Sequence, residues 1–210
     1  LGVPCHIAAR DLSDVEQATD WVAAAEEALG PIDVLVNNAG VQHVGPTEEM
    51  DCEGGEGLLA VNLLSPLRLI RHLLPKMLER KAGTIVNIAS MAALAPTAGM
   101  TYYNSSKGGL AAASEAMHGE VRSQGVHVIT VYPGIIFTPM GTAGYARYEE
   151  TLGMKLQPRG TTTELARLIR RAELRRKARV VYPRVYLLTR WFPALTRVVM
   201  DRFTPKLKEH

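Results

Sequence analysis

Apolar residues along the chain fall into two alternating patterns: short continuous runs, and longer segments with one apolar face. The short runs predict β-strands at residues 3–8, 33–36, 84–88, 126–132 and 180–182. The longer segments predict helices over residues 14–28, 58–80, 101–123 and 163–177. Ser13 or Asp14 is placed to cap the first helix, because both side chains accept hydrogen bonds from a helix start. The second helix should begin after Gly54, Gly55 and Gly57, because glycine weakens a helix interior.

Strand and helix alternate with short connections, and the strands are apolar on both faces. That pattern is typical of an α/β fold in which a doubly wound parallel sheet lies between two layers of helices. Ligands bind beyond the carboxyl ends of such strands. Polar residues follow three of the strands, with Asn37-Asn38 after one, Ser90 after the next and Pro133-Gly134 after the third. We therefore expect the functional site at that edge of the sheet.

Length and composition suit one domain with a sizeable core. The chain has 210 residues, of which 47% are hydrophobic and 21% charged. Its apolar runs are too short and too interrupted to predict a membrane-spanning helix. Cys5 and Cys52 show no pairing pattern, which favours free thiols in a reducing, cytoplasmic compartment. The six histidines lack metal-ligand spacing, so no metal site is expected.

Charge is divided unevenly along the chain. Residues 1–158 carry 10 basic and 17 acidic side chains, whereas residues 159–210 carry 14 basic and 4 acidic ones. The second segment therefore predicts contact with an acidic surface, such as membrane headgroups or another subunit. Nucleic acid is not an expected partner, because nothing else in the chain resembles a module that binds it.

Tyr103 and Lys107 form the sharpest local feature. They lie four residues apart in a predicted helix, so their side chains share one face. An ammonium group beside a phenol favours the phenolate and lowers the phenol's pKa from about 10. Such a phenol can act as a general acid and base. A Tyr-x-x-x-Lys pair is also common by chance on helix surfaces, so its context decides.

That context is a set of ordered motifs. Asn37-Asn38-Ala39-Gly40 follows a strand, and Asn62, Ser90 and the Tyr103–Lys107 pair follow in order. Residues 133–138, Pro-Gly-Ile-Ile-Phe-Thr, come after the next strand. In these motifs the sequence resembles the short-chain dehydrogenase/reductase family over essentially its whole length. The resemblance implies a Rossmann-like, three-layer α/β/α fold.

The resemblance also implies an NAD(P)-dependent oxidoreductase that interconverts a secondary alcohol and a ketone. Tyr103 would be the catalytic acid/base, and Lys107 would lower its pKa and bind the nicotinamide ribose. Ser90 would position the substrate oxygen, and Asn62 would hold a water that relays protons to Lys107. The alternative, purely structural roles are a cap at the strand end for Ser90 and an amide that packs within the helix layer for Asn62. Tyr102 is off the shared face and is expected to pack or to line a pocket.

For the cofactor, NAD or NADP, the resemblance implies two groups of contacts. Asp11 and Leu12 would lie near the adenine, although Asp11 is often only a turn residue. Tyr103 and Lys107 would contact the ribose next to the nicotinamide. The remaining contacts would line the cofactor cleft and surround the nicotinamide; these residues are Asn37, Asn38, Ala39, Gly40, Pro133, Gly134, Ile136 and Thr138.

Family members begin with a strand, a TGxxxGxG turn, a helix and a second strand, and we find none of these here. The expected sheet is therefore incomplete at its N-terminal side, and the choice between NAD and NADP cannot be read. The chain begins at Leu1, which favours a partial form of a normal enzyme. The alternative is a truncated, non-catalytic protein with a binding or regulatory role.

Residues 1–158 are expected to form the core, and residues 159–210 to add its last helix and strand and a basic amphipathic extension of the same domain. Pro193 should divide this extension, over residues 184–203, into two short helices lying over the substrate entrance. Met140, Tyr145 and Met154 would add to an apolar pocket wall, which suits a lipid-like alcohol or ketone. The extension could instead pack against another subunit of a homodimer or homotetramer, or bind a membrane surface reversibly.

Overall fold

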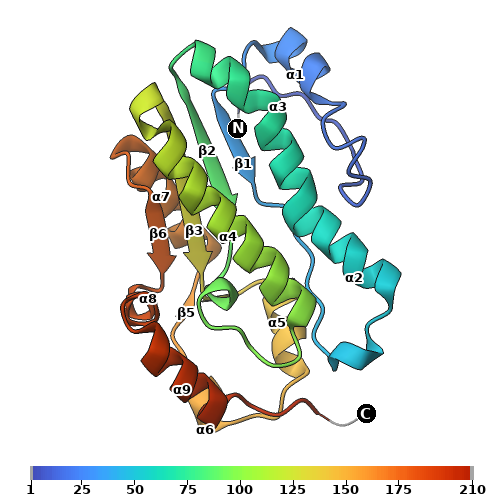
Figure 1. The fold of residues 1–210 in the computed structure, drawn as a ribbon, viewed down its shortest axis with the longest axis vertical. Helices are drawn as coiled ribbons and strands as arrows, with labels where there is room; N and C mark the ends of the chain where they lie inside the picture. Colours follow the sequence, from blue (N-terminus) through green and yellow to red (C-terminus); the bar gives the residue numbers. More distant parts are fainter. Residues whose placement is uncertain (1, 209–210) are drawn as a thin grey trace.

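Four parallel strands form the main sheet of the protein (Figure 1). The computed structural model describes residues 2–208. In spatial order the strands are β1 Val34–Asn37, β2 Gly83–Ile88, β3 Val126–Pro133 and β6 Arg179–Tyr182. The strands predicted at 33–36, 84–88, 126–132 and 180–182 are confirmed. A small second sheet pairs β4, Ile135–Ile136, with β5, Arg159–Gly160.

Helices cover both faces of the main sheet, as the apolar strands predict. Alternate residues of a strand point to opposite faces. Ile85 and Val128 pack with α3, Ser65–Glu79, and α4, Thr101–Val121, while Val131 packs with α7, Thr162–Leu174. Figure 1 shows α3 and α4 in front of the sheet and α7 behind it. The expected Rossmann-like, three-layer α/β/α arrangement is confirmed.

The second helix begins at Cys52, so the prediction that it starts after the three glycines is wrong. Helix α2, Cys52–Leu59, continues through a π-helical turn, Ala60–Leu64, directly into α3. Asp51 caps its start, because the side chain accepts a hydrogen bond of 2.6 Å from the backbone N–H of Gly54. Gly55 is buried, and a Cβ there would lie 2.5 Å from the Tyr102 ring of α4. Close packing of two helices thus selects a residue that propensity alone disfavours.

By length and composition, the continuous helix Cys52–Glu79 is apolar enough to cross a membrane. The hydropathy pattern of the sequence predicts no such segment. Its apolar side chains have another place in this structure, since Leu69, Leu73 and Met77 pack in the core against the sheet. We therefore interpret it as a core helix.

The N-terminal segment departs from the prediction. Residues 3–8 form no strand, and the Ile7 side chain is 87% exposed. The reason is that β1 is the edge of the sheet, so the described residues offer this segment no neighbouring strand. The first helix, α1 Val22–Leu29, also begins later than predicted. Asp14 instead holds a turn, in which its carboxylate accepts hydrogen bonds from the N–H groups of Glu16 and Gln17.

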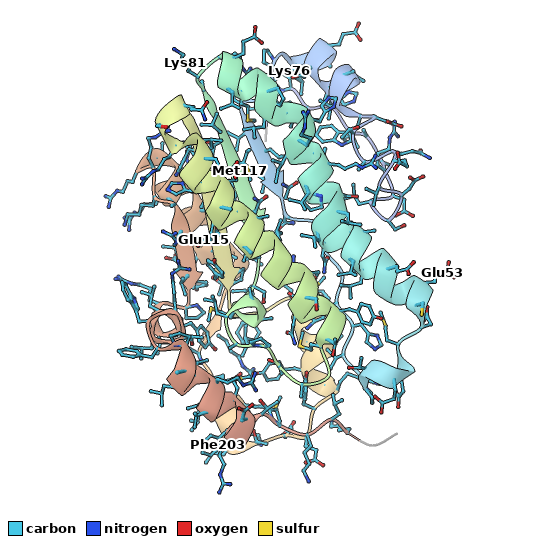
Figure 2. The ribbon with its side chains drawn as sticks, viewed as in Figure 1. Glu53, Lys76, Lys81, Glu115, Met117 and Phe203 are labelled. Atoms are coloured by element: carbon cyan, nitrogen blue, oxygen red, sulfur yellow. The ribbon has the colours of Figure 1, made fainter. Side chains whose placement is uncertain are left out.

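Two short helices follow β6, which confirms that part of the prediction. They are α8, Leu187–Trp191, and α9, Pro193–Phe203. Phe192, whose backbone is not helical, separates the two helices. Glu115 of α4 (Figure 2) attaches α8 to the core, because its carboxylate binds Arg190 of α8, Arg179 of β6 and the Tyr132 hydroxyl. Residues 209–210 of the predicted extension lie outside the described residues.

Candidate active site

Lys107 of α4 lies almost completely buried beneath the carboxyl end of β2. Its side chain is 5% exposed, and its Nζ donates a hydrogen bond of 2.9 Å to the Ile88 carbonyl. Burial lowers the pKa of this amine to about 8, because a charge loses its hydration there. The amine is therefore mostly protonated at pH 7. Sequence reasoning missed the Ile88 carbonyl, since a backbone acceptor leaves no signal in residue type.

Tyr103 lies one helical turn before Lys107, with the Lys107 Nζ 6.0 Å from the centre of its ring. Burial raises the pKa of the Tyr103 phenol, and a hydrogen bond donated by the Ser90 hydroxyl lowers it by less. The expectation that Lys107 lowers this pKa is therefore not met in the chain by itself. The reason is geometric, because the Lys107 ammonium group binds Ile88 rather than the phenol oxygen. Ser90, Tyr103 and Lys107 do come together as the sequence predicts.

Asn62 is fully buried in the π-helical turn and binds the loop after β1. Its Oδ1 accepts from the Val41 N–H at 2.9 Å, and its Nδ2 donates to the Val41 carbonyl at 2.8 Å. Nδ2 also lies 3.1 Å from the Ser106 hydroxyl. These bonds make Asn62 a clamp between two segments. Its suggested role in a water relay stays a prediction.

A chain of buried polar groups fixes the same edge of the sheet. The Asn37 side chain donates to the Asn87 Oδ1 at 2.7 Å, and the Asn87 side chain donates to the Ser114 hydroxyl at 2.7 Å. This chain connects β1, β2 and α4, and its hydrogen bonds satisfy groups that would otherwise be costly to bury. Asn87 and Ser114 were not singled out from the sequence, although a polar residue inside an apolar strand was a usable signal.

The predicted cofactor residues fall in two places. Leu12, Asn38 and Ala39 line a groove of about 600 Å³ along the open side of β1. Gly40 follows Ala39, and a Cβ there would lie 3.3 Å from the Lys107 Nζ. Asp11 is exposed, and its carboxylate accepts from the N–H and hydroxyl of Ser13 at 2.8 Å, which lowers its pKa.

The second place is the segment after β3. Gly134 donates a hydrogen bond of 2.7 Å to the Tyr182 carbonyl, and a side chain at this glycine would lie 2.4 Å from the Tyr186 ring. Ile136 lies in β4, and Thr138 caps the next helix by accepting from the Gly141 N–H. Because the strands are parallel, this segment, which begins at Pro133, shares one sheet edge with Ser90 and Asn37.

Comparison with known proteins identifies the family. Residues 2–148 match a family model described as short chain dehydrogenase. The chain belongs to the short-chain dehydrogenase family. As a member, it is similar to a fatty acyl-CoA reductase of Mycobacterium tuberculosis, with 39% identity over 143 residues, 67% of this chain and 47% of that protein. The chain spans about half the length of the curated relatives it matches.

Solved structures of short-chain dehydrogenases share the fold. A metagenomic short-chain oxidoreductase in complex with NADP is 37% identical, with a TM-score of 0.60 over 63% of this chain and 60% of that chain. A short-chain dehydrogenase from Streptomyces avermitilis is 28% identical, with a TM-score of 0.75 over 92% of this chain and 76% of that chain. Within residues 2–208, no group of three His, Cys, Asp or Glu side chains is placed to hold a metal ion.

Proposed function

We propose that the protein is an NAD(P)-dependent oxidoreductase that interconverts a secondary alcohol and a ketone. The observation that carries the proposal is the arrangement of Ser90, Tyr103 and Lys107. The Ser90 hydroxyl is hydrogen-bonded to the Tyr103 phenol, and a buried amine lies beneath them at the carboxyl end of the sheet. Family membership and the NADP complex of a similar protein support the same reading.

The chain has residues that fit a nicotinamide cofactor at two points. Leu12, Asn38 and Ala39 lie beside the open side of β1, and Gly40 lets the backbone pass close to Asn62 and the Lys107 amine. These residues would hold the adenine side and the ribose next to the nicotinamide. When bound, the cofactor supplies or accepts the hydride.

The protein's own groups manage the proton. In the reduction of a ketone, Ser90 donates a hydrogen bond to the substrate oxygen, and Tyr103 transfers its phenolic proton to that oxygen. The Lys107 ammonium group lies 6.0 Å from the centre of the Tyr103 ring and is mostly protonated at pH 7, so it attracts the phenolate that remains, although in the chain by itself burial keeps the pKa of the phenol raised. Oxidation of the alcohol follows the same path in reverse, with the phenolate as base.

An apolar substrate fits the surroundings of Tyr103. Its ring packs against a buried cluster formed by Val44, Met100, Tyr148 and Met154. Apolar walls of this kind favour a greasy group over a small polar sugar. Similarity to a fatty acyl-CoA reductase agrees with this proposal.

The test compares Tyr103→Phe with Tyr102→Phe, which removes a neighbouring phenol that packs on Gly55. The chain is joined at its N-terminus to the strand, glycine-rich turn, helix and second strand of a relative, and NAD(P)H oxidation is followed with long-chain ketones. Tyr103→Phe should abolish turnover and retain cofactor binding, while Tyr102→Phe retains both. Equal turnover by both variants would contradict the role of Tyr103. Cofactor binding by a folded wild-type protein without turnover would favour the non-catalytic alternative.

We also propose that this protein is cytoplasmic and assembles as a homodimer or homotetramer. In addition, we propose that it binds anionic membrane surfaces through α8 and α9. The outer face of these helices is apolar, and Trp191, Leu195 and Phe203 are 61–74% exposed. Figure 2 shows Phe203 at the end of α9. Residues 184–208 carry six basic side chains and one acidic one. A symmetric contact between two such faces would bring like charges together, so anionic lipid is the better partner.

In vesicle sedimentation, Trp191→Ala with Leu195→Ala should reduce binding to phosphatidylserine vesicles. Val3→Ala with Ile7→Ala, which also removes exposed apolar groups, should leave binding unchanged. Binding should weaken as salt rises, because exposed charges are screened over about 8–10 Å at physiological ionic strength. Equal sedimentation of both double variants would exclude this membrane contact, and self-association of the wild type through the same face would show in sedimentation velocity.

A further inference from the structure

The last described residues pair with a segment far away in the sequence. After α9, residues 204–208, here named the C-terminal strap, run antiparallel to residues 147–149 (Figure 1). The Glu149 N–H donates to the Lys206 carbonyl at 2.9 Å, and the Lys208 N–H donates to the Arg147 carbonyl at 2.9 Å. The strap therefore binds the backbone between α5, Pro139–Ala146, and α6, Leu152–Leu156.

The Lys208 side chain adds a contact to this pairing. Its Nζ donates a hydrogen bond of 2.9 Å to the carbonyl of Ala146, the last residue of α5. A cation at the C-terminus of a helix is favourable, because the unpaired carbonyls there carry partial negative charge. Two backbone bonds and one side-chain bond thus tie the strap to this segment.

Leu207 packs in the apolar surroundings of Tyr103 and so anchors the strap there. Its side chain packs against the buried cluster of Val44, Met100, Tyr148 and Met154, on which the Tyr103 ring also packs. Gly99, which has a φ of 78°, makes room for it, because a Cβ there would lie 2.9 Å from the Leu207 methyl groups. The Tyr148 hydroxyl, bound to the Ala98 carbonyl at 2.7 Å, joins the same loop to the cluster.

The α5–α6 segment, residues 139–156, is also anchored near its centre and in α6, because Tyr148 and Met154 lie in the buried cluster and the Arg147 Nε donates a hydrogen bond of 3.2 Å to the Val44 carbonyl. Helix α5 buries none of its residues, and Leu152 and Leu156 of α6 are each 73% exposed. Parts with so little apolar burial open at low cost, so the position of α5 depends on the contacts just after it, which include those of the strap.

We propose that the C-terminal strap is a specificity-determining part of the substrate site. It holds the α5–α6 segment beside Tyr103, and Leu207 sets how much space the apolar cluster leaves for the substrate. The specificity part rests on the proposed function, because it needs a substrate at Tyr103. The holding part rests only on the contacts of the strap.

The holding part is tested by hydrogen exchange of the full 210-residue chain. Lys208→Pro removes both the Lys208 N–H and its amine, and should speed exchange at Glu149 and in α5 by about tenfold or more. Lys206→Pro is the matched control, because it keeps the Lys206 carbonyl that accepts from Glu149 and the Lys208 donor. Exchange in α3 should not change in either variant. Equal exchange at Glu149 in Lys208→Pro and wild type would overturn the proposal.

The specificity part is tested by kcat/KM for a short-chain and a long-chain ketone, in the joined protein used for Tyr103. Leu207→Ala should shift the ratio toward the bulkier ketone by about tenfold, the range expected for a changed apolar contact. Leu174→Ala, the same change at a leucine of α7 that is 66% exposed, should not shift it. An unchanged ratio in Leu207→Ala would remove Leu207 from the substrate site. Absence of turnover in wild type would instead overturn the proposed function, and the exchange result would still decide whether the strap holds the segment.

Discussion

At the scale of single residues, Lys107 places a positive charge in an almost completely buried position. Its ammonium group has the Ile88 carbonyl as a partner, and its folded pKa of about 8 lies below its usual value of 10.5. Folding therefore disfavours the protonated form. The destabilisation is fully present below pH 8 and disappears as the pH rises through 10.5, where the unfolded chain also loses the proton.

The first prediction at this scale compares wild type with Lys107→Met by urea unfolding between pH 7 and pH 10.5. The free energy of unfolding of wild type should rise relative to the variant by roughly 2–4 kcal/mol, because each pKa unit corresponds to about 1.36 kcal/mol. Subtracting the variant removes the titration of tyrosines and other shared groups. A difference that does not change with pH would show that the amine is not buried as described.

The sequence predicts side chains better than it predicts their backbone partners. Tyr103 and Lys107 follow from a spacing of four, and Ser90 from its place after a strand. The Ile88 and Val41 backbone groups, which hold Lys107 and Asn62, could not be predicted, because every residue carries the same amide. The raised pKa of Tyr103 also depends on burial that only the packed chain defines.

At the scale of elements, packing decides where α2 begins. Two glycines of that helix have different surroundings, although propensity treats them alike. A Cβ on Gly55 would lie 2.5 Å from the Tyr102 ring, whereas nothing lies within 4 Å of one on Gly57. Periodicity located the strands and most helices, but it could not show that a neighbouring helix favours glycine here. It likewise could not show that residues 3–8 lack a strand to pair with.

The two glycines give opposite predictions for one substitution. Gly55→Ala should lower the free energy of unfolding by about 1–2 kcal/mol, because the added methyl group overpacks the contact with Tyr102. Gly57→Ala should raise it by up to about 1 kcal/mol, because alanine is the better helix former and meets no neighbour. Thermal and denaturant unfolding measure both. The same sign for the two variants would contradict the close approach of α2 and α4.

At the scale of the whole molecule, the sheet has an open side. Within the described residues, strand β1 pairs only with β2, and its Val34 and Val36 side chains are 46% and 52% exposed. An unpaired strand with exposed apolar groups is a template for association with another chain. This open side was expected from the family's strand order, whereas the strap after α9 left no pattern in the sequence.

The open edge of β1 predicts that the protein self-associates, and that one added charge on this strand should reduce the association. Val36→Lys should reduce self-association of the 210-residue chain in sedimentation velocity, because a lysine at a sheet edge disfavours pairing. Val3→Lys adds the same charge at a valine that is 65% exposed outside the sheet, and should have little effect. Equal loss of association in both variants would indicate that net charge, rather than the β1 edge, controls it.

The π-helical turn at Ala60–Leu64 also constrains how this chain can change in length. Losing one residue there would restore regular α-helical hydrogen bonding, and no backbone polar group would lose its partner. A π-helical turn holds about one more residue than an α-helical turn, so this deletion would leave α2 and α3 facing nearly the same way, with Gly55 still against Tyr102. The same deletion inside α2 or α3 would instead rotate one part of the helix against the other by about 100°, the angle between successive residues. A one-residue deletion within Cys52–Glu79 should therefore be best tolerated at this turn, provided that Asn62 keeps its bonds to Val41.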